Sequence, residues 1–209
     1  MIKKIILASQ SPRRSEILKK AHYDFVSFPT HVSEIPDKNL NIQEQIIEIA
    51  RRKAKACLEL LATTQPDQGL PSFDLKSDLV LSADTMVCFQ DQMLGKPESE
   101  QMAYDYLKLL SGKTHQVKTA VYLIDLETTR ETSLIETTNV HFKNLTDDEI
   151  LKYIKTKEPM DKAGAYGIQG MGGNLVSSYD GDFNNVVGLP LHALENLFKI
   201  NQWTLKRLD

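Results

Sequence analysis

Two adjacent arginines, Arg13 and Arg14, follow a short apolar run near the start of the chain. The run covers residues 2–8 and predicts a buried strand. Ser11 and Pro12 then predict the start of a helix, because serine favours the capping position and proline suits the first turn, where no backbone N–H is needed. The unpaired amides of such a helix start and two guanidinium groups together form a candidate anion site. The alternative is an ordinary strand–helix corner with solvated arginines.

A single carboxylate, Asp84, interrupts an otherwise apolar stretch. The flanking residues 79–81 and 86–89 are predicted to be buried strand pieces. A charged side chain between them is costly unless it is paired, binds a metal or faces a cleft. Its chemistry would then be to bind a metal ion or to take a proton from water. The alternative is an Asx turn that joins the two pieces as a hairpin.

Three further charged residues are candidates for work on a phosphorylated ligand. Glu34 lies in a predicted loop, where an acid is most simply a solvated surface group. Lys53 stands in a basic run that is typical of a solvated helix face, but it lies beside the apolar stripe of the predicted helix 42–61. Lys96 is fixed between a glycine and a proline, which favours it as a phosphate ligand.

The segment 160–170 is rich in glycine and carries a polar amide, Gln169, near its end. It is not a P-loop, since no Gly-Lys-Ser/Thr closes it, and its spacing and context differ from the dinucleotide fingerprint. It is either a set of turns or a loop whose backbone comes close to a planar ligand. The Gln169 amide offers one donor and one acceptor, which match N3–H and O4 of uracil or thymine and, after a flip, cytosine.

Composition limits the classes of protein to consider. The 209 residues are 41 % hydrophobic and 25 % charged, which predicts an enzyme-like chain of one domain, with or without a smaller lobe. The net charge of −3 gives no general attraction to nucleic acid or to an anionic membrane. We therefore expect neither partner, and any phosphate site has to be a local cluster of lysine and arginine.

The cysteines and the apolar segments indicate a cytoplasmic protein. Cys57 and Cys88 are far apart and fit no metal or redox spacing, which predicts buried thiols in a reducing compartment. The five histidines include no HExxH-type pair, so a zinc site is not favoured. The N-terminal apolar run is too short for a signal peptide, and no segment is long enough to span a bilayer.

Helical and strand patterns are mixed along the chain without strict alternation, which predicts a mixed sheet flanked by helices. Helices are expected from residue 12, at 42–61, at 99–110, from the capping box at 146–149, and at 191–200. Strands are expected at 2–8, 25–28, 79–89 in two pieces, 117–125, 133–142, 175–176 and 186–187, and a loop at 63–77.

Taken together, these motifs resemble the Maf family of nucleoside triphosphate pyrophosphatases. Each is weak alone, but the set is specific because it follows the family's order over nearly the whole chain. The matching pieces are Ala8-Ser9-x-Ser11-Pro12-Arg13-Arg14, Glu34, Lys53-Ala54, Ala83-Asp84-Thr85, Leu94-Gly95-Lys96-Pro97, residues 161–170, and Asn185-Val186-Val187-Gly188-Leu189-Pro190.

The resemblance implies a fold and a reaction. The fold is α/β, with a mixed twisted sheet flanked by helices, elongated and two-lobed with a central cleft like that of the inosine triphosphate pyrophosphatases. Residues 1–209 would form this single domain. The reaction is hydrolysis between the α- and β-phosphates of a nucleoside triphosphate, giving the monophosphate and pyrophosphate, with a divalent cation, Mg²⁺ or Mn²⁺, as cofactor.

The resemblance also implies residue roles. Asp84 would be the general base and, with Glu34, a metal ligand. Phosphates would be bound by Ser9, Arg14, Lys53, Lys96 and Lys162, and substrate choice would be set by Arg13, Thr85 and Gln169. The set is chemically coherent, because a triphosphate carries about four negative charges that a divalent ion and several cationic side chains have to neutralise.

Within the family, the Ser-Pro-Arg-Arg, Ala-Asp-Thr and Ile-Gln-Gly variants resemble the branch that acts on dTTP and UTP, rather than the one that acts on 7-methyl-GTP. The expected role is cleaning of the nucleotide pool, with a link to cell-division arrest and a homodimer as open points. The alternatives are a Maf-type enzyme for modified or purine triphosphates and a non-catalytic nucleotide-binding regulator. Two departures stand out: many members carry an arginine at Glu48 and an acidic residue at Ser33. The loop at 63–77 also looks longer than usual.

Overall fold

The computed structural model describes residues 2–63, 74 and 76–208, so most of the loop predicted at 63–77 lies outside the described residues. The chain forms two compact units. Unit 1 comprises Met1–Asp84, Ala120–Ile135 and Leu191–Asp209, and unit 2 comprises Thr85–Thr119 and Glu136–Pro190. Each unit is therefore assembled from segments that are distant in the sequence.

The elements alternate irregularly, as the sequence predicts. The strands are β1 (Ile2–Lys3), β2 (Ile5–Leu7), β3 (Phe25–Ser27), β4 (Leu79–Phe89), β5 (Gln92–Leu94), β6 (Thr114–Asp125), β7 (Glu131–Phe142), β8 (Val176–Asp180) and β9 (Thr204–Leu205). The helices are α1 (Pro12–Lys20), α2 (Ile42–Thr63), α3 (Glu100–Leu110), α4 (Asp147–Lys155), α5 (Phe183–Val187) and α6 (Leu191–Ile200), with 3₁₀ turns η1 (Glu158–Asp161), η2 (Ala163–Ala165) and η3 (Gly170–Leu175).

The larger sheet is mixed, which confirms the predicted sheet class. Its strand order is β3-β2-β4-β6-β7-β8, with β5 beside β4, while β1 and β9 form a separate pair. Strand β2 is parallel to both β3 and β4, whereas β5 is antiparallel to β4 and β8 to β7. Strands β4, β6 and β7 contribute residues to both units.

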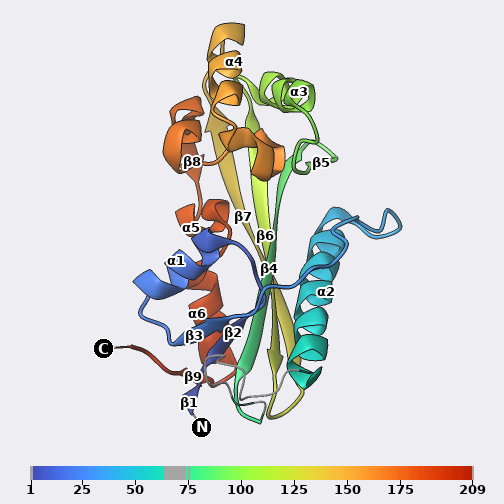
Figure 1. The fold of residues 1–209 in the computed structure, drawn as a ribbon. Helices are drawn as coiled ribbons and strands as arrows, with labels where there is room; N and C mark the ends of the chain where they lie inside the picture. Colours follow the sequence, from blue (N-terminus) through green and yellow to red (C-terminus); the bar gives the residue numbers. More distant parts are fainter. Residues whose placement is uncertain (1, 64–73, 75, 209) are drawn as a thin grey trace. The chain divides into compact units, whose positions relative to one another are not determined.

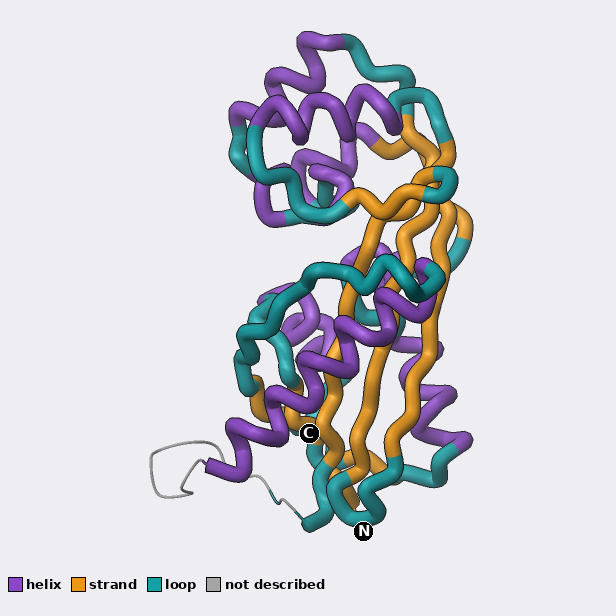
Figure 2. Tube along the Cα trace, turned by 90° about the vertical axis from the view of Figure 1, so that its right-hand side faces the viewer, coloured by secondary structure: helices purple, strands orange, loops and turns teal. Residues whose placement is uncertain are grey.

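In unit 1, helices cover both faces of the strands. Helix α2 lies on one face, and α1 and α6 lie on the other (Figure 1); Figure 2 shows α2 running across the strands. Strand β2 is the buried centre, since Ile5, Ile6 and Leu7 are all 0 % exposed. A run that is apolar at every position is what a strand covered on both faces requires.

The strand predicted at residues 2–8 is divided in two. The Lys4 N–H donates to the Asp78 carboxylate at 2.9 Å instead of to a neighbouring strand. Before this point β1 pairs with β9, and after it β2 pairs with β3 and β4. The single predicted strand is wrong because a carboxylate far along the chain takes up one of its backbone donors.

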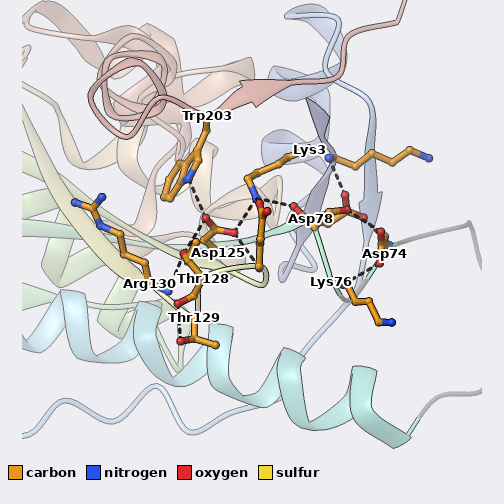
Figure 3. A network of polar contacts seen from close by, with 12 residues as sticks. Lys3, Asp74, Lys76, Asp78, Asp125, Thr128, Thr129, Arg130 and Trp203 are labelled. Carbon is orange, nitrogen blue, oxygen red and sulfur yellow. Dashed lines mark hydrogen bonds and ion pairs between the residues drawn. The ribbon is translucent and has the colours of Figure 1, made fainter. Parts of the chain in front are cut away.

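A buried ion pair joins the N-terminal segment to the end of β6 within unit 1 (Figure 3). The Lys3 ammonium lies 2.9 Å from the Asp125 carboxylate, and both side chains are at most 5 % exposed. Lys3 also contacts Glu127 at 2.8 Å, and the Trp203 indole donates to Asp125 at 3.0 Å. Burial raises the pKa of Asp125, but hydrogen bonds from Lys3, the Glu127 N–H and Thr128 outweigh it, so the net shift is downward.

In unit 2, α3, α4 and the 3₁₀ turns pack together beside the strands (Figure 2). Both predicted helix starts are confirmed. The Ser99 hydroxyl accepts from the Met102 N–H at 3.1 Å, and Thr146 and Glu149 form the complete capping box. These caps satisfy backbone donors that a helix start leaves unpaired.

The strand predicted at 186–187 is wrong, because these residues end the short helix α5. The Asp182 carboxylate accepts from the Asn184 N–H at 2.7 Å and so begins the helix. Gly188, with φ 125°, ends it. The strands predicted at 117–125 and 133–142 are confirmed as β6 and β7, which are neighbours in the sheet and are joined by a short turn.

We expect Lys3→Met to lower the free energy of unfolding by about 3 kcal/mol at pH 7, because it leaves a buried carboxylate without its cation. Urea denaturation measures this. The control Lys20→Met removes only the exposed Lys20–Glu16 pair and should cost less than about 0.5 kcal/mol. Since the pKa of Asp125 is depressed by folding, its stabilisation is present above the ordinary pKa of an aspartate and is lost as the pH falls through the folded value. A loss for Lys3→Met no larger than the control's would contradict the assignment.

Candidate functional site

Asp84 lies inside one continuous strand, β4, so the hairpin alternative is wrong. It is 6 % exposed, in a strand held to the N-terminal segment by parallel pairing with β2 and by the Ala8 N–H donating to the Leu81 carbonyl at 2.8 Å. A carboxylate in the middle of a buried strand needs a partner. That partner is Lys53, whose ammonium lies 2.6 Å from the Asp84 carboxylate.

Lys53 reaches Asp84 because its stem lies on the buried face of α2. It follows Ile49 by four residues and Ile46 by seven, which puts all three on one side of the helix. Ile46 and Ile49 are 0 % exposed, and Lys53 is 9 % exposed. The basic run around Lys53 is thus not a uniformly solvated face, since the Lys53 chain passes along apolar surface to a buried acid.

Glu34, which precedes Lys53 in the chain, contacts the same ammonium. It lies in a segment without helix or strand that follows β3, and its side chain is 45 % exposed. One of its oxygens is 2.6 Å from the Lys53 ammonium. The structure therefore brings together the two acids that the sequence marks as candidates, with a lysine between them.

Ser9 and Arg14 form a second contact of unit 1 at the start of α1. Arg14 is 9 % exposed and donates to the Ser9 hydroxyl at 3.2 Å. The same hydroxyl accepts from the Ser11 N–H at 3.1 Å. The position of the helix start is confirmed, with Ser11 as the capping residue and Pro12 in the first turn, but the Ser11 side chain makes no capping hydrogen bond. Ser9 organises this corner instead.

The charges of this group of residues act on one another. Burial raises the pKa of Asp84; the Lys53 and Arg14 charges oppose this shift, while the Glu34 charge adds to it. Burial lowers the pKa of Arg14, against the Asp84 and Glu34 charges. Two carboxylates and two cations thus act on one another at this site. A raised pKa also makes Asp84 a better proton acceptor than an ordinary aspartate.

The donor set suits a divalent cation that also binds the substrate. Within the described residues, no group of three or more His, Cys, Asp or Glu side chains gathers to hold a metal alone. Mg²⁺, however, is commonly bound through one or two carboxylates together with substrate phosphates and water. Asp84 and Glu34 converge on one cation, the Lys53 ammonium, and so they fit such an ion.

Four other candidates belong to unit 2, whose position relative to unit 1 is not determined. Lys162 contacts the Glu158 carbonyl and the Asp161 carboxylate, each at 2.6 Å. Lys96 is exposed. Gln169, which immediately precedes η3, is exposed too.

Thr85 is the fourth candidate in unit 2. It is held by Thr119, which in turn contacts Asn185, and neither side chain was a candidate in the sequence analysis. The Thr119 hydroxyl donates to the Asn185 carbonyl at 2.9 Å and lies 3.0 Å from the Thr85 hydroxyl. Because Thr119 has only one hydroxyl hydrogen, Thr85 is the donor in this pair. Asn185 is 0 % exposed and donates to the Val117 carbonyl and the Thr138 hydroxyl, each at 3.0 Å.

Arg52 is a further residue that sequence reasoning missed. It donates to the carbonyls of Ser33 and Ile35 at 2.7 and 2.9 Å. Its place immediately before Lys53 was the available signal. The two cysteines are free and buried as predicted, and burial raises the pKa of Cys57 to about 12. No described helix combines the length and apolar character needed to cross a membrane.

Known proteins match this chain over nearly its whole length. A family model described as "Maf-like protein" matches residues 4–200. The dTTP/UTP pyrophosphatase of Bdellovibrio bacteriovorus is 53 % identical over 92 % of this chain and 96 % of its own. Those of Caldicellulosiruptor bescii and Bacillus velezensis are 42 % and 44 % identical, over 92 % and 91 % of this chain and 92 % and 93 % of theirs.

A solved structure, named as protein VC0702 from Vibrio cholerae, covers 97 % of this chain and 99 % of its own at 9 % identity, with a TM-score of 0.37. That score carries no argument about this chain. The family model and the relatives do, because they match nearly its whole length, and they show that the chain belongs to the Maf family.

Proposed function

We propose that this protein is a nucleoside triphosphate pyrophosphatase that hydrolyses dTTP and UTP to the monophosphate and pyrophosphate. The observation that carries the proposal is the buried Asp84 carboxylate, held with Glu34 around one cation. Its support is membership of the Maf family and the names of relatives up to 53 % identical. As a hydrolase acting on a phosphoric anhydride, it needs a base, cationic neutralisation and a site for the nucleobase.

In the proposed reaction, Asp84 takes a proton from water while the water oxygen attacks the α-phosphorus. The bond between this phosphorus and the oxygen that bridges it to the β-phosphorus breaks, and its electron pair leaves with pyrophosphate. Asp84 suits the proton transfer because burial raises its pKa. When bound, a divalent ion on Asp84 and Glu34 would supply charge neutralisation to the phosphates.

Cationic side chains would share that neutralisation. Arg14 is preorganised, because the Ser9 hydroxyl fixes its guanidinium at 3.2 Å. Lys53 has a long flexible stem and would pair with phosphate oxygens when a metal ion takes up the two carboxylates. In unit 2 we propose Lys96 and Lys162 as further phosphate ligands, on the basis of the Maf motifs in which they stand.

Base recognition is assigned to Arg13, Thr85 and Gln169 by the same motifs. Gln169 matches the imide edge of uracil and thymine, with its amide N–H₂ toward O4 and its oxygen toward N3–H. The two-lobed arrangement with a cleft, expected from the resemblance, would let residues of both units meet one substrate. It stays a prediction, as do Mg²⁺ or Mn²⁺ as the metal, the homodimer, the cytoplasmic location and the link to cell division.

Two alternatives to the proposed function differ from it in the substrate or in the absence of catalysis. A Maf enzyme for modified or purine triphosphates would use the same acids with a different base site. A non-catalytic nucleotide-binding regulator would gain little from a buried carboxylate beside an ammonium, which is costly to bury and is suited to catalysis. The buried Asp84 therefore favours an enzyme.

The reaction is tested by the products. With Mg²⁺ or Mn²⁺, the protein should release pyrophosphate and monophosphate from dTTP and UTP, and Asp84→Asn should lower kcat by about 10²–10⁴-fold, the usual contribution of a positioned base. The fold of the variant, checked by circular dichroism, should persist because shape and volume are kept. Orthophosphate as the first product would contradict the bond that we assign, and a variant with more than half of the turnover would remove Asp84 from catalysis.

In the metal-free protein, burial raises the pKa of Asp84, so its carboxylate should take up a proton at a higher pH than an ordinary aspartate does. NMR titration of the metal-free protein measures this. Lys53→Met removes the opposing charge and should move the titration to higher pH, and Glu34→Gln removes the like charge and should move it to lower pH. Shifts in the same direction for both variants would show that another group titrates.

Specificity is tested at Gln169. We expect Gln169→Ala to lower kcat/KM for dTTP and UTP. The loss should correspond to about 1–3 kcal/mol of transition-state stabilisation, since the imide edge of the base loses its hydrogen bonds. Poorer substrates should lose less, so the preference narrows across a panel of nucleoside triphosphates. Unchanged ratios over the panel would rule out base reading by Gln169 without affecting the roles of the two acids.

A further inference from the structure

The Glu34 segment has little of its own to hold it. Residues 28–37 form neither helix nor strand, and Ile35, next to Glu34, is 76 % exposed and so contributes no apolar anchor. Within the segment, the Ile35 N–H and the Ser33 hydroxyl are 3.4 Å apart, which is a weak hydrogen bond at best. A carboxylate that has to meet Lys53 and Asp84 needs a firmer support than this.

Two consecutive residues of α2 supply it. Lys53 binds the Glu34 carboxylate, and Arg52 binds the backbone on both sides of Glu34. One arm of the Arg52 guanidinium donates to the Ser33 carbonyl at 2.7 Å, and the other donates to the Ile35 carbonyl at 2.9 Å. The planar fork of an arginine fixes two acceptors at once, which a lysine ammonium on a flexible stem does less well.

The neighbouring charges leave Arg52 available for this task. Glu48, one helical turn earlier, is taken up by Arg51 through both oxygens, at 2.7 and 3.0 Å. The nearest Glu48 oxygen is 4.0 Å from the Arg52 Nε, which is too far for a hydrogen bond. Glu48 therefore contributes long-range attraction to Arg52 and does not compete for its two terminal nitrogens.

We propose that Arg52 is a positioning residue for Glu34: its guanidinium holds the carbonyls of Ser33 and Ile35, and so places the Glu34 carboxylate where it meets the cation shared with Asp84. Arg52 touches neither substrate nor metal in this role. The inference rests on the proposed function, because it takes Glu34 to be a ligand of the divalent ion.

A double-mutant cycle tests whether Arg52 acts through Glu34. Arg52→Ala should lower kcat/KM by roughly 10–100-fold, the usual effect of losing a group that orients a metal ligand. In a Glu34→Gln background the same change should have no further effect, because the carboxylate that Arg52 positions is already gone. Lys55→Ala is the matched control: it removes a charge from the same helix, its partner is Glu131 and not Glu48 or the segment, and it should change kcat/KM by no more than about twofold.

Two readouts do not depend on turnover. The affinity for Mn²⁺ alone, measured by electron paramagnetic resonance, should fall by roughly 10–100-fold in Arg52→Ala and stay near the wild-type value in Lys55→Ala. Hydrogen exchange of the Ser33–Ile35 amides should become faster in Arg52→Ala only. Arg52→Lys keeps the charge and the stem but offers no planar fork, so it should lie between wild type and Arg52→Ala in both readouts.

The outcomes separate this inference from the function itself. Wild-type release of pyrophosphate and its loss in Asp84→Asn decide the function. Wild-type kcat/KM and Mn²⁺ affinity in Arg52→Ala would overturn the role of Arg52. It would also be overturned if Arg52→Ala lowered kcat/KM as much in the Glu34→Gln background as in the wild type. If Arg52→Ala lowers the melting temperature markedly, Arg52→Lys decides instead. A wild-type Mn²⁺ affinity together with wild-type hydrogen exchange at residues 33–35 in Arg52→Lys would overturn the proposal.

Discussion

The Lys53 ammonium is the interaction on which the site in unit 1 depends. It lies 2.6 Å from both Asp84 and Glu34, two carboxylates that would repel each other in its absence. Its position depends on the contact between α2 and β4, where the Ser82 hydroxyl donates to the Ala50 carbonyl at 2.7 Å, and on the burial of the α2 face that contains Ile46 and Ile49. The hydrophobic packing of one helix thus sets the electrostatics of the site, and a shift of α2 would separate a base from its charge partner.

Much of this arrangement can be predicted locally. Asp84 is conspicuous because a lone acid in a buried strand has to be paired, and Lys53 because it lies beside an apolar stripe. The helix starts at Pro12, Ser99 and Thr146 follow from capping preferences that involve only near neighbours. These signals find the elements and the candidate acids, but none of them says which cation the acids share.

Sequence reasoning missed contacts whose partners carry no recognisable local pattern. The split of the first strand comes from Asp78, which takes the Lys4 N–H. The role of Ser9, in place of Ser11, comes from the buried guanidinium of Arg14. Arg52 looked like part of a solvated basic run because its acceptors are main-chain carbonyls, and a carbonyl carries no signature in the sequence.

Glu48 and Ser33, the two positions at which the resemblance leads us to expect other residues, both lie beside Arg52. Arg52 binds the main chain of Ser33, and Glu48 lies between Arg51 and Arg52 on the same helix face. An arginine at position 48 would place three like charges within a turn and a half of α2, which is unfavourable. With Glu48, one acid binds Arg51 and attracts Arg52 from 4.0 Å, and the segment that carries Glu34 is held through the carbonyls of residues 33 and 35 and not through the side chain of residue 33.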